Sequence, residues 1–183
     1  MSRPSFFPLI ALLSATLFAP VVAAPAAAAD KPHIVYLMPD DLGWHDVGYL
    51  GKEIRTPNID RIAAEGMRLT TFYSNAPVCT PTRAALLTGR YPFRYGFQTL
   101  SLLPTSTYGL PVEERTLAQA LKDAGYRTAL VGKWQLGHAR PEFLPNRRGF
   151  DSFYGTLAGG IDPFTKQGPR GLVDWRRNDK PVK

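Results

Sequence analysis

Runs of apolar residues along the chain mark three candidate strands. His33–Met38 is a continuous apolar run that ends at Pro39, which is typical of a buried strand in a parallel sheet. Met67–Tyr73 and Arg127–Val131 are the second and third candidates. We therefore expect an α/β fold built on a mostly parallel sheet with helices packed against it.

Capping and stop signals predict helices between these strands. Thr56 suits the cap of a short helix over Asn58–Glu65, and Gly66 ends it. Thr116–Gln119 has the capping-box pattern of a second helix, which Gly125 closes. That helix carries an apolar stripe, expected to face the core, formed by Leu117, Leu121 and Ala124.

Two further segments have the composition of connections. Arg90–Glu114 is rich in Pro, Gly, Ser and Thr, and we expect a long ordered loop over the functional site. Leu172–Val182 is predicted to form a hairpin.

The composition is that of a globular protein, with 44% hydrophobic and 20% charged residues. The formal net charge of +7 suits an anionic partner, and a solvated basic surface explains it equally well. No nucleic-acid recognition motif accompanies the charge, so nucleic acid is not an expected partner.

The first 29 residues have the pattern of a secretory signal peptide. Arg3 is the positive region, Leu9–Val22 is the apolar core, and cleavage is expected after Ala24 or Ala29. No apolar run is long enough for a membrane span. We expect an exported protein, periplasmic or secreted, and the lack of an Asn-x-Ser/Thr sequon favours a periplasm over a lysosome.

Asp40 and Asp41 directly follow the first candidate strand. Ligands of open α/β sheets bind beyond the carboxyl ends of the strands, and two adjacent carboxylates can hold a hard cation through oxygen. An isolated Asp-Asp pair is more often a turn or a helix cap. The position after a strand makes this pair a candidate metal site.

Cys79 is the only cysteine of the chain, and it precedes a predicted helix. Pro81 suits the first turn, Ala84–Leu87 propagates well, and Gly89 ends the helix. A side chain at this place faces unpaired N–H groups, and Arg83 returns to the same side one turn later. Such a place stabilises a nucleophile or an anion, whereas a lone cysteine is usually a small buried hydrophobic residue.

The longer run Cys79–Arg90 resembles the signature of the sulfatases, Cys-x-Pro-x-Arg followed by a small-residue helix that ends in Leu-Thr-Gly-Arg. Asp40–Trp44 resembles the metal motif of that family, and Arg55–Asp60 is similar to another of its segments. The resemblance implies an alkaline-phosphatase-like fold with a mixed, mostly parallel sheet flanked by helices. It also implies a formylglycine made from Cys79 by a formylglycine-generating enzyme. A divalent metal, Ca²⁺ or Mg²⁺, would be held by Asp40, Asp41 and the modified Cys79.

Gly132–His138 resembles the family segment Gly-Lys-Trp-His-Leu-Gly. The resemblance implies that Lys133 contacts the sulfate group, although a single lysine is normally an exposed charge. Gln135 stands where the family usually has histidine, and an amide cannot accept a proton near neutral pH. His138 has the opposite parity along an extended strand, so it is not an obvious substitute.

Leu144–Gly155 resembles the arylsulfatase B branch, which removes 4-sulfate from N-acetylgalactosamine in dermatan and chondroitin sulfate. Arg147 and Arg148 lie in this run. They could serve an acidic glycan or anchor a loop, and we favour the anchor.

The resemblance implies a sulfuric ester hydrolase of the arylsulfatase type, acting on a sulfated glycan or small molecule. Its catalytic residues would be Cys79 as the nucleophile, Arg83 holding the modified side chain, and Lys133 binding sulfate and offsetting its charge. Two other interpretations stay open. One is a phosphonate or phosphodiester hydrolase with the same cysteine motif, and the other is a non-catalytic fragment that only binds sulfated glycans.

The resemblance runs from about His33 to the end of the chain. We expect a signal peptide over residues 1–29 and the N-terminal part of a sulfatase catalytic domain over residues 30–183, because family members are much longer. Part of a sheet leaves an open edge and uncovered apolar faces. The 183-residue chain alone is therefore expected to have low stability.

Overall fold

A computed structural model describes residues 31–51, 53–98, 101–162, 164–168 and 171–182. The predicted signal peptide over residues 1–29 lies outside the described residues. The chain divides into two units, Met1–Met38 and Pro39–Lys183, and the sheet and the candidate site belong to the second. Within the described ranges, no helix has both the length and the apolar character that crossing a membrane requires.

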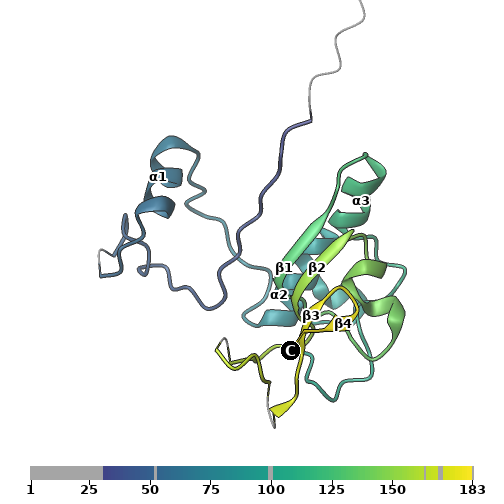
Figure 1. The fold of residues 1–183 in the computed structure, drawn as a ribbon. Helices are drawn as coiled ribbons and strands as arrows, with labels where there is room; N and C mark the ends of the chain where they lie inside the picture. Colours follow the sequence, from purple (N-terminus) through teal and green to yellow (C-terminus); the bar gives the residue numbers. More distant parts are fainter. Residues whose placement is uncertain (1–30, 52, 99–100, 163, 169–170, 183) are drawn as a thin grey trace, which may run out of the picture. The chain divides into compact units, whose positions relative to one another are not determined.

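The second unit contains one mixed sheet of four strands in the order β1-β2-β3-β4 (Figure 1). The strands are β1 Ala129–Lys133, β2 Ser152–Thr156, β3 Trp175–Arg177 and β4 Lys180–Pro181. β1 pairs with β2 in parallel, and the other two pairs are antiparallel. An open mixed sheet with helices agrees with the expected fold class. β1 confirms the third candidate strand, displaced by two residues, and β3 and β4 form the predicted hairpin.

The helices are α1 Pro57–Glu65, α2 Cys79–Thr88 and α3 Leu117–Asp123, with the short 3-10 helices η1 Pro92–Tyr95, η2 Pro141–Phe143 and η3 Pro145–Arg147. The C-terminal end of α2 and the start of α3 follow the local signals, whereas the Thr56 side chain makes no cap hydrogen bond at the start of α1. Gly89 closes α2 with φ 66° and donates its N–H to the Ala85 carbonyl at 2.8 Å. On α3 the capping box forms as predicted, because Gln119 N donates to Thr116 Oγ1 (3.1 Å) and Thr116 N donates to Gln119 Oε1 (2.8 Å).

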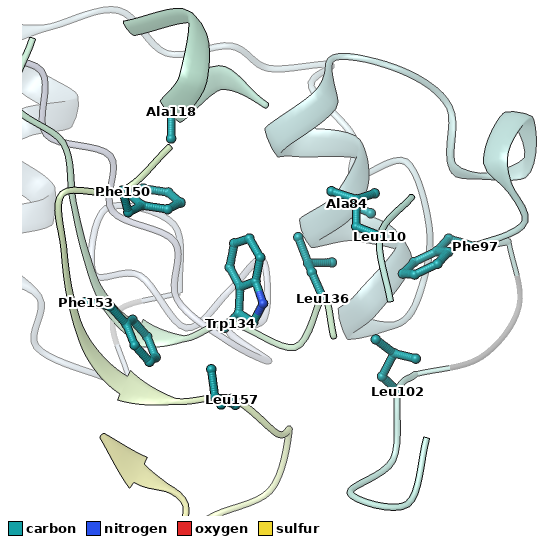
Figure 2. Close-up of a cluster of buried hydrophobic side chains, with 10 residues drawn as sticks. All are labelled: Ala84, Phe97, Leu102, Leu110, Ala118, Trp134, Leu136, Phe150, Phe153 and Leu157. Carbon is teal, nitrogen blue, oxygen red and sulfur yellow. The ribbon is translucent and has the colours of Figure 1, made fainter. Parts of the chain in front are cut away.

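The hydrophobic core lies between α2, α3 and one face of the sheet. Its ten buried members are Ala84, Phe97, Leu102, Leu110, Ala118, Trp134, Leu136, Phe150, Phe153 and Leu157 (Figure 2). Trp134 is only 1% exposed and lies in the middle of this cluster. Its indole N–H donates to the carbonyls of Gly137 (3.1 Å) and Phe143 (3.0 Å), so the largest core side chain leaves no polar atom unpaired.

Two of the predicted strands do not form. His33–Met38 and Met67–Tyr73 have no strand structure, and most of their large side chains are exposed, with Val35 at 79%. A strand is stable only when a neighbour takes up its backbone hydrogen bonds and another layer covers its side chains. The described sheet contains only β1 to β4. Neither run has such a neighbour there, and Asp40 therefore does not follow a strand.

The apolar stripe expected on α3 is also wrong. Leu117 is 46% exposed, and the only buried residue of the helix is Ala118. The cause is a close approach of the chain at Gly149, where an added Cβ would collide with the backbone of Ala118 and Gln119. A helix that is approached so closely turns its smallest side chain, rather than its leucines, to the core.

Candidate active site

Four of the site residues predicted from sequence line one open cavity of about 520 Å³. They are Asp40, Asp41, Cys79 and Lys133, and the wall also contains Gln135 and Trp175. Arg83 is not part of this wall, and it contacts the backbone of Lys133. The structure thus gathers residues that are widely separated in the sequence.

Cys79 is the first residue of α2 and is a half-buried free cysteine. The next residue, Thr80, is fully buried and fixes this end of the helix. Thr80 Oγ1 donates to the Gln135 carbonyl (3.1 Å) and accepts from the Leu102 N–H (2.9 Å). The end of β1 and the loop 90–114 are thereby tied to Cys79, and Ser101 of that loop lines the cavity.

Asp40 is shared by two cationic side chains. Lys133 Nζ donates to Asp40 Oδ2 at 2.7 Å, and Arg83 Nη2 lies 3.8 Å from the same oxygen. Arg83 Nη1 also donates to the Lys133 carbonyl at 2.7 Å. Both cationic side chains are largely buried, 12% exposed for Arg83 and 15% for Lys133. This arrangement places two positive charges beside the cavity that contains Cys79.

The protonation of these groups follows from their contacts. The hydrogen bond from Lys133 lowers the pKa of Asp40, burial acts in the opposite direction, and the charges of Lys133 and Arg83 lower the pKa further. Burial lowers the pKa of Arg83, while the charges of Asp40 and Cys79 act to raise it. The Asp40 carboxylate is therefore held in its ionised form.

The carboxylates of Asp40 and Asp41 are suitable ligand types for a hard cation, because Ca²⁺ and Mg²⁺ prefer oxygen ligands. Asp41 has φ 58°, a left-handed conformation that costs a non-glycine residue roughly 1–2 kcal/mol. Such strain is found at ligand sites more often than elsewhere. Among the described residues there is no group of three or more His, Cys, Asp or Glu that could hold a metal. A cation held by Asp40 and Asp41 would therefore need further ligands.

Gln135 occupies the place in which the resemblance expects histidine. It is 4% exposed and also has a left-handed φ, 53°. Its Nε2 donates to the Leu102 carbonyl (3.2 Å), and within the described ranges its Oε1 has no hydrogen-bond partner. An added Cβ at Gly159 would collide with this amide, so the glycine makes room for it.

His138 does not take over the role of a base in the cavity. Its Nε2 lies 2.9 Å from the Pro104 carbonyl, and the residue is not part of the cavity wall. His138 therefore contacts the loop 90–114 and not the cavity. Its strand parity predicted only that it is not an obvious substitute for the family histidine.

Arg148 confirms the loop-anchor interpretation. The side chain is 2% exposed and donates to the carbonyls of Leu110 (3.2 Å), Pro111 (3.0 Å) and Glu114 (2.6 Å). The neighbouring Arg147 is exposed. One of the two arginines therefore holds the loop 90–114 and is not available to a glycan.

Sequence reasoning missed several residues of the cavity. Thr156 and Trp175 line it from β2 and β3, and Ile161 lines it from the segment after β2. Their places depend on strand register, for which the sequence offers no local signal. Thr80 lay within the quoted motif, and its structural role appears only once its partners are known.

The cavity combines two carboxylates, a lysine and a half-buried cysteine, and comparison with known proteins identifies the class. A protein-family model described as Sulfatase matches residues 32–168, most of the chain. The chain therefore belongs to the sulfatase family.

Individual relatives agree with this class. The chain is 44% identical to arylsulfatase J of Mus musculus over 142 residues, which are 78% of this chain and 24% of the relative. It is 47% identical to N-acetylgalactosamine-6-sulfatase of Homo sapiens over 159 residues, 82% of this chain and 30% of the relative. The chain thus spans about a quarter to a third of the length of these relatives. Their names support the family, and they do not carry the 4-sulfatase specificity expected from Leu144–Gly155.

Solved structures give the same result for the fold. The crystal structure of Ps i-CgsB matches with a TM-score of 0.72 and 38% identity, over 79% of this chain and 35% of that chain. A second structure of that protein, described as a complex with k-i-k-neocarrahexaose, matches with a TM-score of 0.69 over the same shares.

Proposed function

We propose that this chain carries the nucleophile half of an enzyme that hydrolyses sulfate esters at the Cys79 cavity. The observation that carries the proposal is the convergence of Cys79, Asp40, Asp41 and Lys133 on one cavity wall. Each of them stands at the place in the sequence where the sulfatase resemblance requires it.

The cationic side chains would bind and orient the sulfate group. Lys133 lies at the end of β1 and lines the cavity, and Arg83 donates a hydrogen bond to the Lys133 carbonyl. Both charges are partly buried, so they are screened less than surface charges and attract an anion more strongly. Charge that develops on the transferred group is then offset by donors already in place.

Cys79 would act as a formylglycine, made by a formylglycine-generating enzyme. A formylglycine supplies a hydrated aldehyde with two hydroxyl groups, one to attack sulfur and one to release sulfate afterwards. A divalent cation, Ca²⁺ or Mg²⁺, would be held by Asp40, Asp41 and the modified residue 79, and it would lower the pKa of a bound hydroxyl group. Thr80 and Arg83 would keep residue 79 in its orientation.

The proposed substrate is a sulfated small molecule or glycan, and the proposed location is outside the cytoplasm. Two observations support these points: the neocarrahexaose complex described for the similar Ps i-CgsB, and the signal-peptide pattern of residues 1–29. The domain assignment proposed for residues 30–183 is the N-terminal part of the catalytic domain.

Turnover of p-nitrophenyl sulfate by the full-length natural protein tests the proposal. Cys79→Ala should abolish turnover, and Lys133→Met should lower kcat/KM by about 10²–10³. The matched control is Lys122→Met, because Lys122 is an exposed lysine paired with Asp151; its kcat/KM should stay within twofold.

Two other results would each select another function. Turnover of an aryl phosphonate without turnover of the sulfate would show a phosphonate hydrolase with the same motif. Retained binding of chondroitin sulfate, with Cys79 as an unmodified thiol and no turnover, would show a non-catalytic binding protein. One observation favours the non-catalytic binding protein: the amide of Gln135 cannot act as a base in the cavity.

A further inference from the structure

The wall of the cavity contains a row of three side chains that come from three neighbouring strands. Lys133 on β1 is the direct partner of Thr156 on β2, and Thr156 is the direct partner of Trp175 on β3. Directly paired residues project from the same face of a sheet, and all three line the cavity. Strands lie about 4.8 Å apart, so the backbones of Lys133 and Trp175 are about 10 Å apart along this row.

The two ends of this row differ in chemistry. Lys133 carries a charge and pairs with Asp40. Trp175 offers an aromatic surface, and Ile161 adds an apolar side chain to the same wall. A ligand that matches the row therefore has an anionic group toward the Lys133 end and a ring toward the Trp175 end, which is the arrangement of a sulfate ester of a cyclic alcohol.

The Trp175 end is held in place by its neighbours. The ring of Trp175 meets that of Tyr154 edge to face, with centroids 5.5 Å apart, and the guanidinium of Arg177 lies 5.1 Å from the Tyr154 centroid. Asp174 Oδ2 accepts from Thr156 Oγ1 and from the Ala158 N–H, both at 2.6 Å. The Trp175 end of the row is thus preorganised, which lowers the entropy cost of ordering side chains when a ligand binds.

Two residues of the wall each hold a buried polar atom that has no partner among the described residues. These atoms are the Nε1 donor of Trp175 and the Oε1 acceptor of Gln135. The orientation of the Gln135 amide follows from chemistry, since its Nε2 faces the Leu102 carbonyl and a flipped amide would place two oxygens together. Unpaired buried groups are costly, so the arrangement favours a ligand that pairs with them.

The partner that suits both atoms is a hydroxyl group, because it donates one hydrogen bond and accepts others. A sulfate dianion cannot satisfy Gln135, since it has no hydrogen to donate. The charged end of the row and these two neutral groups therefore recognise different parts of a ligand.

We propose that Trp175 and Gln135 form a subsite for the alcohol part of the substrate, and that this part is a hydroxylated ring, as in a sugar. The Trp175 ring packs against the ring of the substrate, its Nε1 donates to a ring oxygen or hydroxyl, and Gln135 Oε1 accepts from a hydroxyl. The inference rests on the proposed sulfate-ester hydrolysis, and it assigns Trp175 and Gln135 to binding of the alcohol that leaves in this reaction.

The test compares three probes in the full-length natural protein: a sulfated galactose, p-nitrophenyl sulfate, and inorganic sulfate as a competitive inhibitor. Gln135→Met should lower kcat/KM for the sulfated galactose about tenfold more than that for p-nitrophenyl sulfate. Trp175→Ala should lower both by about tenfold, because both rings lose their packing partner. Trp175→Phe should lower kcat/KM for the sulfated galactose more than that for p-nitrophenyl sulfate. Inhibition by sulfate should be unchanged in all three variants, and Phe93→Ala, an exposed aromatic outside the cavity, should match the wild type.

Two results would overturn the inference. One is an unchanged kcat/KM for the sulfated galactose in Gln135→Met and Trp175→Ala. The other is a loss of sulfate inhibition in step with the loss of turnover, which would show that the substitutions disturb the whole cavity. An equal loss for both esters in Gln135→Met, with sulfate inhibition unchanged, would place the hydroxyl partner of Gln135 on residue 79 and would contradict the sugar assignment of that residue.

The subsite can be tested separately from catalysis. If the wild-type protein hydrolyses no sulfate ester, the proposed function fails, and calorimetric binding of the sulfated galactose then decides the subsite. Binding that weakens about tenfold in Trp175→Ala while sulfate binding stays constant would support it. Equal binding by the wild type and Trp175→Ala would reject it.

Discussion

Residues 33–73 and residues 79–158 carry similar apolar runs, but only the second region packs them. In the second region, β1 and β2 pair in parallel and their inner side chains join the core around Trp134. In the first region, the two candidate strands have no pairing strand among the described residues, and their large side chains are mostly exposed. Apolar character alone therefore does not form a strand, because the backbone needs a partner and the side chains need a covering layer.

Helices in the two regions differ less than strands do. α1 forms in the first region although none of its residues is buried, because its hydrogen bonds lie within the helix. α2 forms in the second region with Ala84 and Ala85 buried. The comparison shows that local structure survives without packing, whereas strands depend on contacts that are distant in sequence.

The largest effect should come from the centre of the packed region. Trp134→Ala removes a fully buried indole and should lower the free energy of unfolding by about 3–5 kcal/mol. The matched change in the unpacked region is Tyr36→Ala, since Tyr36 is 59% exposed; it should cost less than about 0.5 kcal/mol. Urea unfolding followed by circular dichroism measures both. Similar losses in the two variants would remove the distinction between the regions.

Arg148 should give the next largest effect. Arg148→Met leaves three loop carbonyls without their charged donor, and the free energy of unfolding should fall by about 2–4 kcal/mol. Arg147→Met is the control, because this side chain is exposed, and it should change stability by less than about 0.5 kcal/mol. Faster proteolysis of the loop 90–114 in Arg148→Met only would show that the arginine anchors this loop. Equal behaviour of the two variants would contradict the anchor.

The smallest effect concerns pH and Asp151. Hydrogen bonds from Lys122 and the Thr128 N–H lower the pKa of Asp151 from 3.8 to about 2. Because this pKa is lower in the folded state, the carboxylate stabilises the fold above pH 3.8 and the contribution is lost as the pH falls toward about 2. Melting temperatures between these two pH values should therefore fall less steeply for Asp151→Asn than for the wild type. Parallel curves would show that the carboxylate has no such link to folding.

The elements that the sequence predicts correctly are those with local causes. Gly89 ends α2 because only a left-handed residue fits there, and the Thr116–Gln119 capping box needs no residue outside its own turn. The hairpin of β3 and β4 follows from a turn at Asn178, which has φ 56°. These features lie within a few residues of their signals.

The elements that the sequence does not predict depend on distant partners. His33–Met38 has the composition of a buried strand and lacks a pairing strand among the described residues. Trp175 lies in a hairpin that was predicted, and its place beside Thr156 and Lys133 follows only from register. The motif around Cys79 predicts residues that the structure brings to one cavity wall, whereas the shape of that cavity arises from segments that are distant in sequence.

The central claim is that Cys79 belongs to a sulfate-ester hydrolase, and the chemical state of this residue tests it most directly. Peptide mass analysis of the protein purified from its natural host would report that state. The account predicts a formylglycine at position 79 in the wild type and its absence in a protein with Pro81 and Arg83 both changed to alanine, since both belong to the signature. An unmodified thiol at position 79 in a protein that folds and is exported would contradict it.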